Sequence, residues 1–182
     1  MPILKESLYK PHPLLKNAHI QTIYPALFRR VKGVHYSREK LETPDGDFLD
    51  LDWSSLHSKK LALVTHGLEG STEQPYVKGM VKSLNEDGWD VLAWNFRGCG
   101  GRPSRLVRSY HSGKTEDLDH VVKHILRKNY ERVALIGFSV GGNITLKYLG
   151  EKGESLDPRL MSSVTFSVPC NLKSTSYKLA TL

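Results

Sequence analysis

The chain of 182 residues is long enough to bury a core, and its 39% hydrophobic content excludes a disordered protein. Its formal charge of +7 comes from basic residues scattered along the sequence, with no aromatic-basic motif, so we expect a solvated basic surface and no nucleic-acid partner. No window approaches the roughly 18 apolar residues of a membrane helix, and the first residues lack a secretory leader. These features predict a cytoplasmic protein without stable membrane insertion.

The first predicted elements are a short helical segment and a β-hairpin. Apolar residues recur at helical spacing between residues 17 and 28, where Pro25 is expected to bend or interrupt the helix, so we predict one or two short helices. Two strand-like segments, 34–41 and 48–53, flank a turn signal at residues 43–47, which predicts the hairpin. The second segment alternates apolar and acidic residues, as is typical of a strand near a sheet edge.

After residue 60 the pattern changes to short apolar segments that alternate with amphipathic helices. The predicted buried, parallel strands cover residues 61–65, 91–94, 133–136 and 164–168, and the predicted helices cover residues 76–85, 115–128 and 142–149. This alternation predicts an α/β fold with a mostly parallel sheet and helices on both faces. Without a repeat or linker, we predict one domain over residues 1–182, with an N-terminal extension (1–32) and a sheet core (33–182).

The segment G-F-S-V-G at residues 137–141 follows an apolar strand and precedes a helix. Strand, G-x-S-x-G and helix together predict a nucleophile elbow, in which Ser139 stands exposed as a nucleophile. A serine also needs a base to take its proton and donors that stabilise the oxyanion. We expect those donors to be the backbone N–H groups of Val140, directly after the nucleophile, and of Leu68, in the glycine-containing loop after strand 61–65.

Four histidines could carry other chemistry, and each is predicted to have a structural role. His66 precedes the serine, whereas in folds with a nucleophile elbow the catalytic histidine follows the serine. We therefore expect His66 to anchor the Leu68 loop. His111 is expected to order a loop. His120 and His124 lie one helical turn apart, a spacing that can bind metal, but no third ligand accompanies them and a solvated helix face is preferred.

Two glycine-containing segments could suggest a phosphate site. The loop at residues 95–101 lacks the third glycine and helix start of a dinucleotide site, and residues 113–115 lack the first glycine of a P-loop. We therefore expect no cofactor. Cys99 and Cys170 have no metal-like spacing and suit a reducing compartment; Cys99 could be a reactive thiol, and Cys170 is expected to pack at a strand end.

These motifs together resemble the YheT-like carboxylesterases of the abhydrolase-4 family, a branch of the α/β hydrolases. The resemblance spans nearly the whole chain and is carried by residues 17–22, 66–71, 95–101, 110–113 and 137–143. It implies an α/β-hydrolase fold and hydrolysis of short- or medium-chain acyl esters or monoacylglycerol-type lipids. By the same resemblance, Ser139 forms an acyl-enzyme with help from an Asp and a His, and no cofactor takes part.

The chain departs from this family after Ser139. Its only later acids are Glu151, Glu154 and Asp157, and no histidine follows, so neither remaining triad member can be assigned. We expect a fold truncated after about the sixth strand and an isolated chain that is nearly inactive. The strand at 164–168 would then be an exposed edge that favours self-association or a complementing C-terminal fragment. The alternative is a catalytically silent hydrolase fold that binds an acyl ligand or a protein.

Overall fold

The computed structural model describes residue 6 and residues 9–181, and the chain divides into two compact units, 1–32 and 33–182. The residues on which the expectation of an absent leader depends lie mostly outside this described part. In the first unit a short 3-10 helix η1 (Pro13–Leu15) precedes α1 (Ala18–Phe28), which begins after the capping residue Asn17. Pro25 lies inside α1 and does not interrupt it, so the expected interruption was wrong, while the predicted short helix is present. A proline removes one N–H, and the following turn still forms because the Arg29 N–H donates to the Pro25 carbonyl at 3.2 Å.

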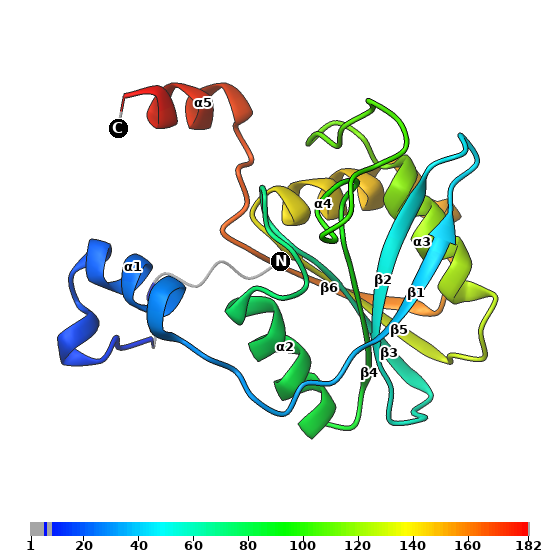
Figure 1. The fold of residues 1–182 in the computed structure, drawn as a ribbon, viewed down its shortest axis with the longest axis horizontal. Coiled ribbons are helices and arrows are strands. Elements are labelled where there is room, and N and C mark those ends of the chain that lie inside the picture. Colours follow the sequence, from blue (N-terminus) through cyan, green and yellow to red (C-terminus); the bar gives the residue numbers. More distant parts are fainter. Residues whose placement is uncertain (1–5, 7–8, 182) are drawn as a thin grey trace. The chain divides into compact units, whose positions relative to one another are not determined.

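The second unit is built on a six-stranded sheet with the strand order β1-β2-β4-β3-β5-β6 (Figure 1). The strands are β1 (Ser37–Glu42), β2 (Phe48–Ser54), β3 (Lys60–Thr65), β4 (Asp90–Trp94), β5 (Arg132–Phe138) and β6 (Leu160–Phe166). β1 and β2 pair as the predicted antiparallel hairpin, and β2 also runs antiparallel to β4. The pairs β3–β4, β3–β5 and β5–β6 are parallel, which confirms the mostly parallel sheet.

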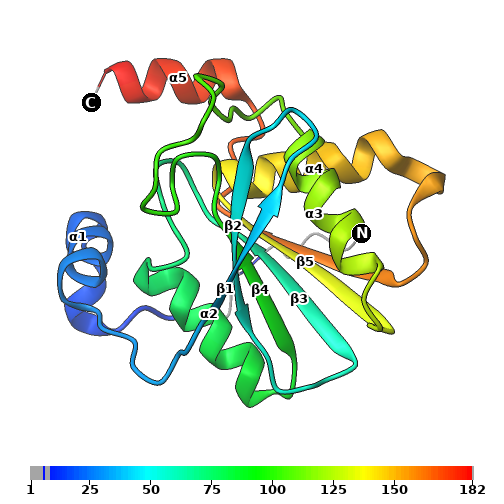
Figure 2. The same cartoon turned by 45° about the vertical axis from the view of Figure 1, so that its right-hand side comes forward.

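Helices cover both faces of this sheet, as predicted (Figure 2). One face is covered by α2 (Pro75–Glu86), and the other by α3 (Glu116–Leu126) and α4 (Val140–Lys152). A short 3-10 helix η2 (Gly153–Ser155) follows α4, and α5 (Leu172–Ala180) ends the described chain.

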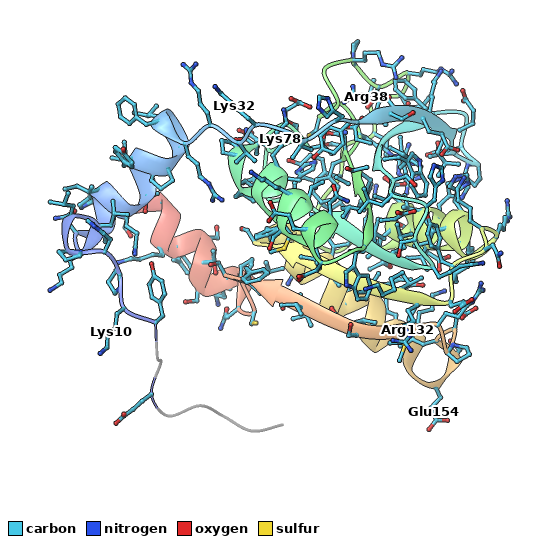
Figure 3. All side chains as sticks on the ribbon, turned by 90° about the horizontal axis from the view of Figure 1, so that it is seen from below. Lys10, Lys32, Arg38, Lys78, Arg132 and Glu154 are labelled. Carbon is cyan, nitrogen blue, oxygen red and sulfur yellow. The ribbon has the colours of Figure 1, made fainter. Side chains whose placement is uncertain are left out.

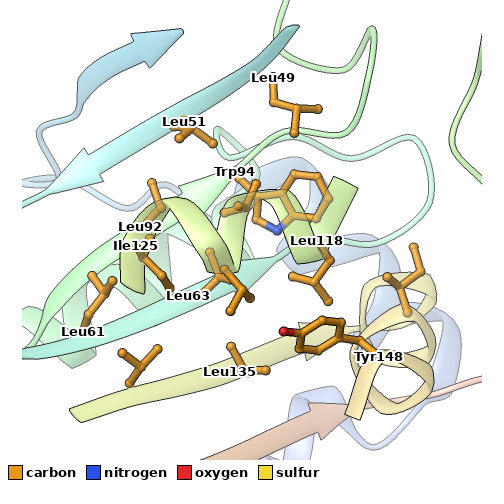
Figure 4. Packing of buried hydrophobic residues seen from close by; sticks show 14 of the residues in the cluster. Leu49, Leu51, Leu61, Leu63, Leu92, Trp94, Leu118, Ile125, Leu135 and Tyr148 are labelled. Atoms are coloured by element: carbon orange, nitrogen blue, oxygen red, sulfur yellow. The ribbon is translucent and has the colours of Figure 1, made fainter. Parts of the chain in front are cut away.

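The central strands are buried on both faces, because alternate side chains enter two separate cores. In the larger core, Trp94 of β4 packs with Leu118 of α3 and Tyr148 of α4 (Figure 4). In the other core, Val64 of β3 packs with side chains of α2, including Val77. Burial on both faces explains why these strands read as continuous apolar runs in the sequence.

β6 differs from its prediction in both position and burial. It runs from Leu160 to Phe166, whereas the sequence predicted residues 164–168. In the part of the chain that the structure describes, β6 is the edge strand beside β5, and its side chains are largely exposed, with Met161 63% and Val164 50% exposed. The edge position was predicted, but the burial inferred from the β-branched composition was not confirmed. An apolar edge of this kind is a surface prone to pairing with another strand.

The acidic residues of β2 are buried, although alternation with apolar residues is typical of a solvated face. Asp52 is 1% exposed and binds the Arg38 guanidinium through two contacts of 2.6 and 2.7 Å. Figure 3 labels Arg38 among the side chains of the second unit. The Thr72 hydroxyl donates to the same carboxylate at 2.5 Å, and the Asn95 amide at 3.0 Å. These partners compensate the cost of burying the charge and tie β2 to the loops that follow β3 and β4.

Candidate active site

Ser139 occupies the sharp turn between β5 and α4. Its backbone has φ 52° and ψ −119°, a region that a residue with a side chain adopts only under strain. The turn is held from both sides, because the Ser139 N–H donates to the Phe166 carbonyl at 2.8 Å and the Ser139 carbonyl accepts the Asn143 N–H at 3.0 Å. The structure therefore has the strained strand–serine–helix turn that the G-x-S-x-G segment predicted.

The glycines of this segment are required by close backbone packing. A Cβ on Gly137 would lie 2.5 Å from the Cα of Gly142. A Cβ on Gly141 would collide with the carbonyl of His66 and lie 2.7 Å from that of Thr65. Backbone atoms cannot rotate out of the way as a side chain can, so α4 approaches the ends of β3 and β5 only because these positions lack a side chain.

The loop after β3 lies beside Ser139, because β3 and β5 are parallel neighbours that end at the same edge of the sheet, with Thr65 opposite Gly137. A Cβ on Gly67 would lie 3.3 Å from the Ser139 Cβ. In the described part of the chain, no acceptor is assigned to the N–H of Leu68 or of Val140. Val140 is the first residue of α4, where backbone N–H groups lack helical partners. The structure thus brings the predicted nucleophile close to the loop that carries Leu68.

His66 is buried, with 1% of its surface exposed, and both ring nitrogens are occupied. Its Nε2 accepts the Phe96 N–H at 3.2 Å, so the neutral ring carries its proton on Nδ1 and donates it to the Gly67 carbonyl at 2.7 Å. Burial lowers the pKa of His66 to about 4. His66 therefore anchors the loop, as expected, and has no free nitrogen to act as a base for Ser139.

The remaining candidates are two histidines and two cysteines. The Nδ1 of His111 accepts the Gly113 N–H at 3.1 Å, within its own loop, and the ring of His120 contacts the Glu42 carbonyl at 2.9 Å. No cluster of three or more metal-binding side chains occurs among the residues that the structure describes. Burial raises the pKa of the Cys99 thiol, which disfavours the reactive thiolate. Cys170 is exposed, so its predicted packing at a strand end was wrong.

Two tyrosines that the sequence did not single out as site residues contact the Leu68 loop. The Tyr76 hydroxyl, from α2, accepts the Gly67 N–H at 2.9 Å, and the Tyr110 hydroxyl accepts the Glu69 N–H at 2.7 Å. Tyr110 belonged to one of the family-like motifs, which was the only available signal. No sequence signal pointed to Tyr76, because a contact between a helix side chain and a loop N–H produces no periodic pattern in the sequence.

Two cavities open next to Leu68 and Val140, which line both of them. One has a volume of about 560 Å³ and includes Ser139 among mainly apolar side chains: Val168, Pro169 and Leu172. The other has a volume of about 770 Å³ and is rich in hydroxyl groups: Ser71, Ser109, Tyr110 and Ser112. A group held at the Leu68 and Val140 N–H groups would therefore have an apolar space on one side and a polar space on the other.

The mostly parallel sheet, with helices on both faces and a strained serine turn after β5, defines an α/β-hydrolase fold. Comparison with protein-family models matches residues 63–181 to the alpha/beta hydrolase fold. The chain belongs to this family, which confirms the fold class and the family predicted from its motifs.

Individual relatives of the chain carry esterase and phospholipase names. The chain is 41% identical over 170 residues to the "Putative esterase YheT" of Escherichia coli K12, covering 90% of this chain and 49% of that protein. It is 29% identical over 181 residues to the phospholipase ABHD3 of Mus musculus, covering 93% and 43%. The solved Pyrococcus furiosus esterase Pf2001 superposes with a TM-score of 0.67 at 26% identity, covering 82% of this chain and 58% of that one.

The chain spans about half the length of the relatives it matches. None of the helices in the described residues is both long and apolar enough to cross a membrane.

Proposed function

We propose that the protein is a serine-dependent carboxylic ester hydrolase in which Ser139 forms an acyl-enzyme. The observation that carries this proposal is the strained turn at Ser139, next to two backbone N–H groups without an assigned acceptor in the described residues. Strain of this kind persists only where the surrounding structure maintains it, and it is frequent at catalytic positions. The esterase and phospholipase names of the relatives agree with the proposal.

In the proposed reaction the Ser139 Oγ attacks the ester carbonyl and loses its proton to a base. The carbonyl oxygen becomes an oxyanion, which accepts hydrogen bonds from the N–H groups of Leu68 and Val140. Collapse of this intermediate breaks the bond to the alcohol oxygen, which takes the proton from the base and leaves as the alcohol, with the acyl group on Ser139. Water then attacks the acyl group and releases it as the carboxylic acid. Because His66 has no free nitrogen and no histidine follows Ser139, we propose that the triad acid and base come from outside residues 1–182.

The substrates that we propose are short- or medium-chain acyl esters or monoacylglycerol-type lipids. The apolar cavity next to Ser139, with Val168 and Leu172, suits the acyl chain. The hydroxyl-rich cavity on the other side of Leu68 suits a polar alcohol such as glycerol. The free cysteines are compatible with a cytoplasmic location.

A fluorophosphonate probe tests the proposal, because it reacts with an activated serine. The chain is combined with a downstream segment that supplies an Asp and a His in family context, and labelling is located by peptide mass spectrometry. We expect labelling at Ser139 that is lost in Ser139→Ala. Ser167→Ala is the matched control, since Ser167 lines the same cavity and also has a φ of 52°. Absence of labelling with the downstream segment present would contradict the proposed function.

A further inference from the structure

The loop of residues 66–70 is fastened by hydroxyl groups from two segments outside it. Tyr76 on α2 holds the Gly67 N–H at 2.9 Å, and Tyr110, from the long connection between β4 and α3, holds the Glu69 N–H at 2.7 Å. The two tyrosines therefore bind the N–H groups on either side of Leu68. The next N–H, that of Gly70, donates to the Gly67 carbonyl at 3.1 Å.

Each tyrosine is itself fixed by an aromatic neighbour that touches the site. The Tyr76 ring meets the edge of Phe138, the residue before Ser139, at a centroid distance of 4.9 Å. The Tyr110 ring stacks on Phe96 at 4.4 Å, and Phe96 in turn donates its N–H to the ring of His66. These contacts restrict where the two hydroxyl groups can lie. They connect the loop to the elbow on one side and to its buried anchor on the other.

The backbone conformation of Glu69 explains why its N–H needs a fixed hydrogen-bond partner. Its φ of 50° is unfavourable for a residue with a side chain, so an unfastened loop would tend to relax from this conformation. Burial raises the pKa of both tyrosine hydroxyls above the ordinary value, so they stay neutral at physiological pH. A neutral hydroxyl oxygen has the lone pairs needed to accept each N–H.

We propose that Tyr76 and Tyr110 are positioning residues, which occupy the N–H groups of Gly67 and Glu69 and thereby leave the Leu68 N–H as the donor that this loop presents to the reacting oxygen, beside the Val140 N–H. This inference rests on the proposed function, because it assigns a role in stabilising the oxyanion. The new element is that the position of the Leu68 N–H depends on side chains outside residues 66–70. Neither hydroxyl touches the substrate; each acts through the backbone that it holds.

The first test measures amide hydrogen exchange by NMR on the 182-residue chain. Tyr110→Phe should accelerate exchange at Glu69, and Tyr76→Phe at Gly67, by roughly three- to tenfold, the effect of one lost hydrogen bond. Tyr130→Phe is the matched control, since its hydroxyl donates to Asp90 at the start of β4 and should change both amides less than about twofold. Unchanged exchange at Gly67 and Glu69 in the two variants would overturn the inference.

The second test measures ester hydrolysis by the chain combined with the downstream Asp- and His-bearing segment. Each variant should lower kcat by roughly 10- to 100-fold with KM within about twofold, because complete loss of an oxyanion donor costs about 100- to 1,000-fold. If the tyrosines had a purely structural role, the variants would unfold at a lower urea concentration but would not show a lower kcat at an unchanged KM. Faster amide exchange with unchanged kcat would overturn the positioning role. Failure to label Ser139 in the unmodified protein would instead contradict the proposed function, and the exchange data would still report on the loop.

Discussion

Replacing Gly141 by alanine would put a methyl group between α4 and the end of β3. The new Cβ would collide with the His66 carbonyl and lie 2.7 Å from the Thr65 carbonyl, where an ordinary contact begins at 3.4 Å. The helix must therefore move by about 0.7 Å, the difference between these two distances, or more at His66. Both obstacles are backbone atoms of the strand end, so they cannot give way by a change of rotamer.

The expected cost follows from the balance of two effects. Overpacking of a well-packed site typically costs about 1–3 kcal/mol, and backbone obstacles place Gly141→Ala at the upper end of this range. Alanine recovers about 1 kcal/mol through its higher helix propensity. We therefore expect a net loss of about 2 kcal/mol in the free energy of unfolding. Ser139 lies two residues before the displaced position, and a misplacement of about 1 Å can lower a reaction rate about 100-fold.

Urea unfolding followed by circular dichroism measures the free energy of unfolding. The rate of fluorophosphonate labelling, with the downstream segment present, measures the reactivity of Ser139. Gly150→Ala is the matched control on the same helix, because no atom lies within 4 Å of its added Cβ. It should stabilise the protein by about 0.5–1 kcal/mol and leave labelling unchanged. If Gly141→Ala were as stable as Gly150→Ala and labelled equally fast, the steric explanation of the elbow would be refuted.

Three further predictions concern His66, Arg97 and Val164. The pKa of His66 is about 4 in the folded protein and 6.5 in the unfolded chain, so the unfolded chain binds more protons between these two pH values. The free energy of unfolding therefore falls by up to about 3 kcal/mol as the pH drops from 6.5 to 4. His66→Gln should flatten the pH dependence of urea unfolding in that window, and an unchanged slope would count against the buried neutral ring. Arg97→Leu leaves the fully buried Asp47 without its 3.2 Å ion-pair partner and should cost about 3–5 kcal/mol in the same assay, whereas a loss below about 1 kcal/mol would be inconsistent with this ion pair. Val164→Lys should reduce self-association at the β6 edge in light scattering, and a wild-type chain that is already monomeric at high concentration would disprove that expectation.

The parts of the fold that were predicted correctly are those with a local pattern. The hairpin has a turn signal, the central strands are apolar on both faces, and the elbow is a short motif in a strand–helix context. The loop that carries Leu68 lies beside Ser139 because the parallel strands β3 and β5 end at one edge of the sheet. The catalytic roles of Ser139, Leu68 and Val140 remain predictions.

The features that were missed depend on how the fold arranges the chain, and the local sequence pattern does not show this. Asp52 lies in an alternating segment that indicated a strand near a sheet edge, and its burial depends on Arg38, Thr72 and Asn95, which the fold brings to it. The exposure of β6 follows from its place at the edge of the sheet formed by the described residues, and its own apolar composition does not show this. Tyr76 is likewise one residue of an amphipathic helix until the fold places its hydroxyl at the Gly67 N–H.

Capture of the acyl-enzyme tests the central claim, the nucleophilic role of Ser139, most directly. The chain with its Asp- and His-bearing segment would be mixed with an activated short-chain ester, quenched in acid within the first turnover, and digested for mass spectrometry. We predict that the peptide containing Ser139 gains the mass of the acyl group and that Ser139→Ala abolishes both this adduct and hydrolysis. An acyl group on a different residue, or hydrolysis by Ser139→Ala at the unmodified rate, would contradict the assignment of Ser139 as the nucleophile.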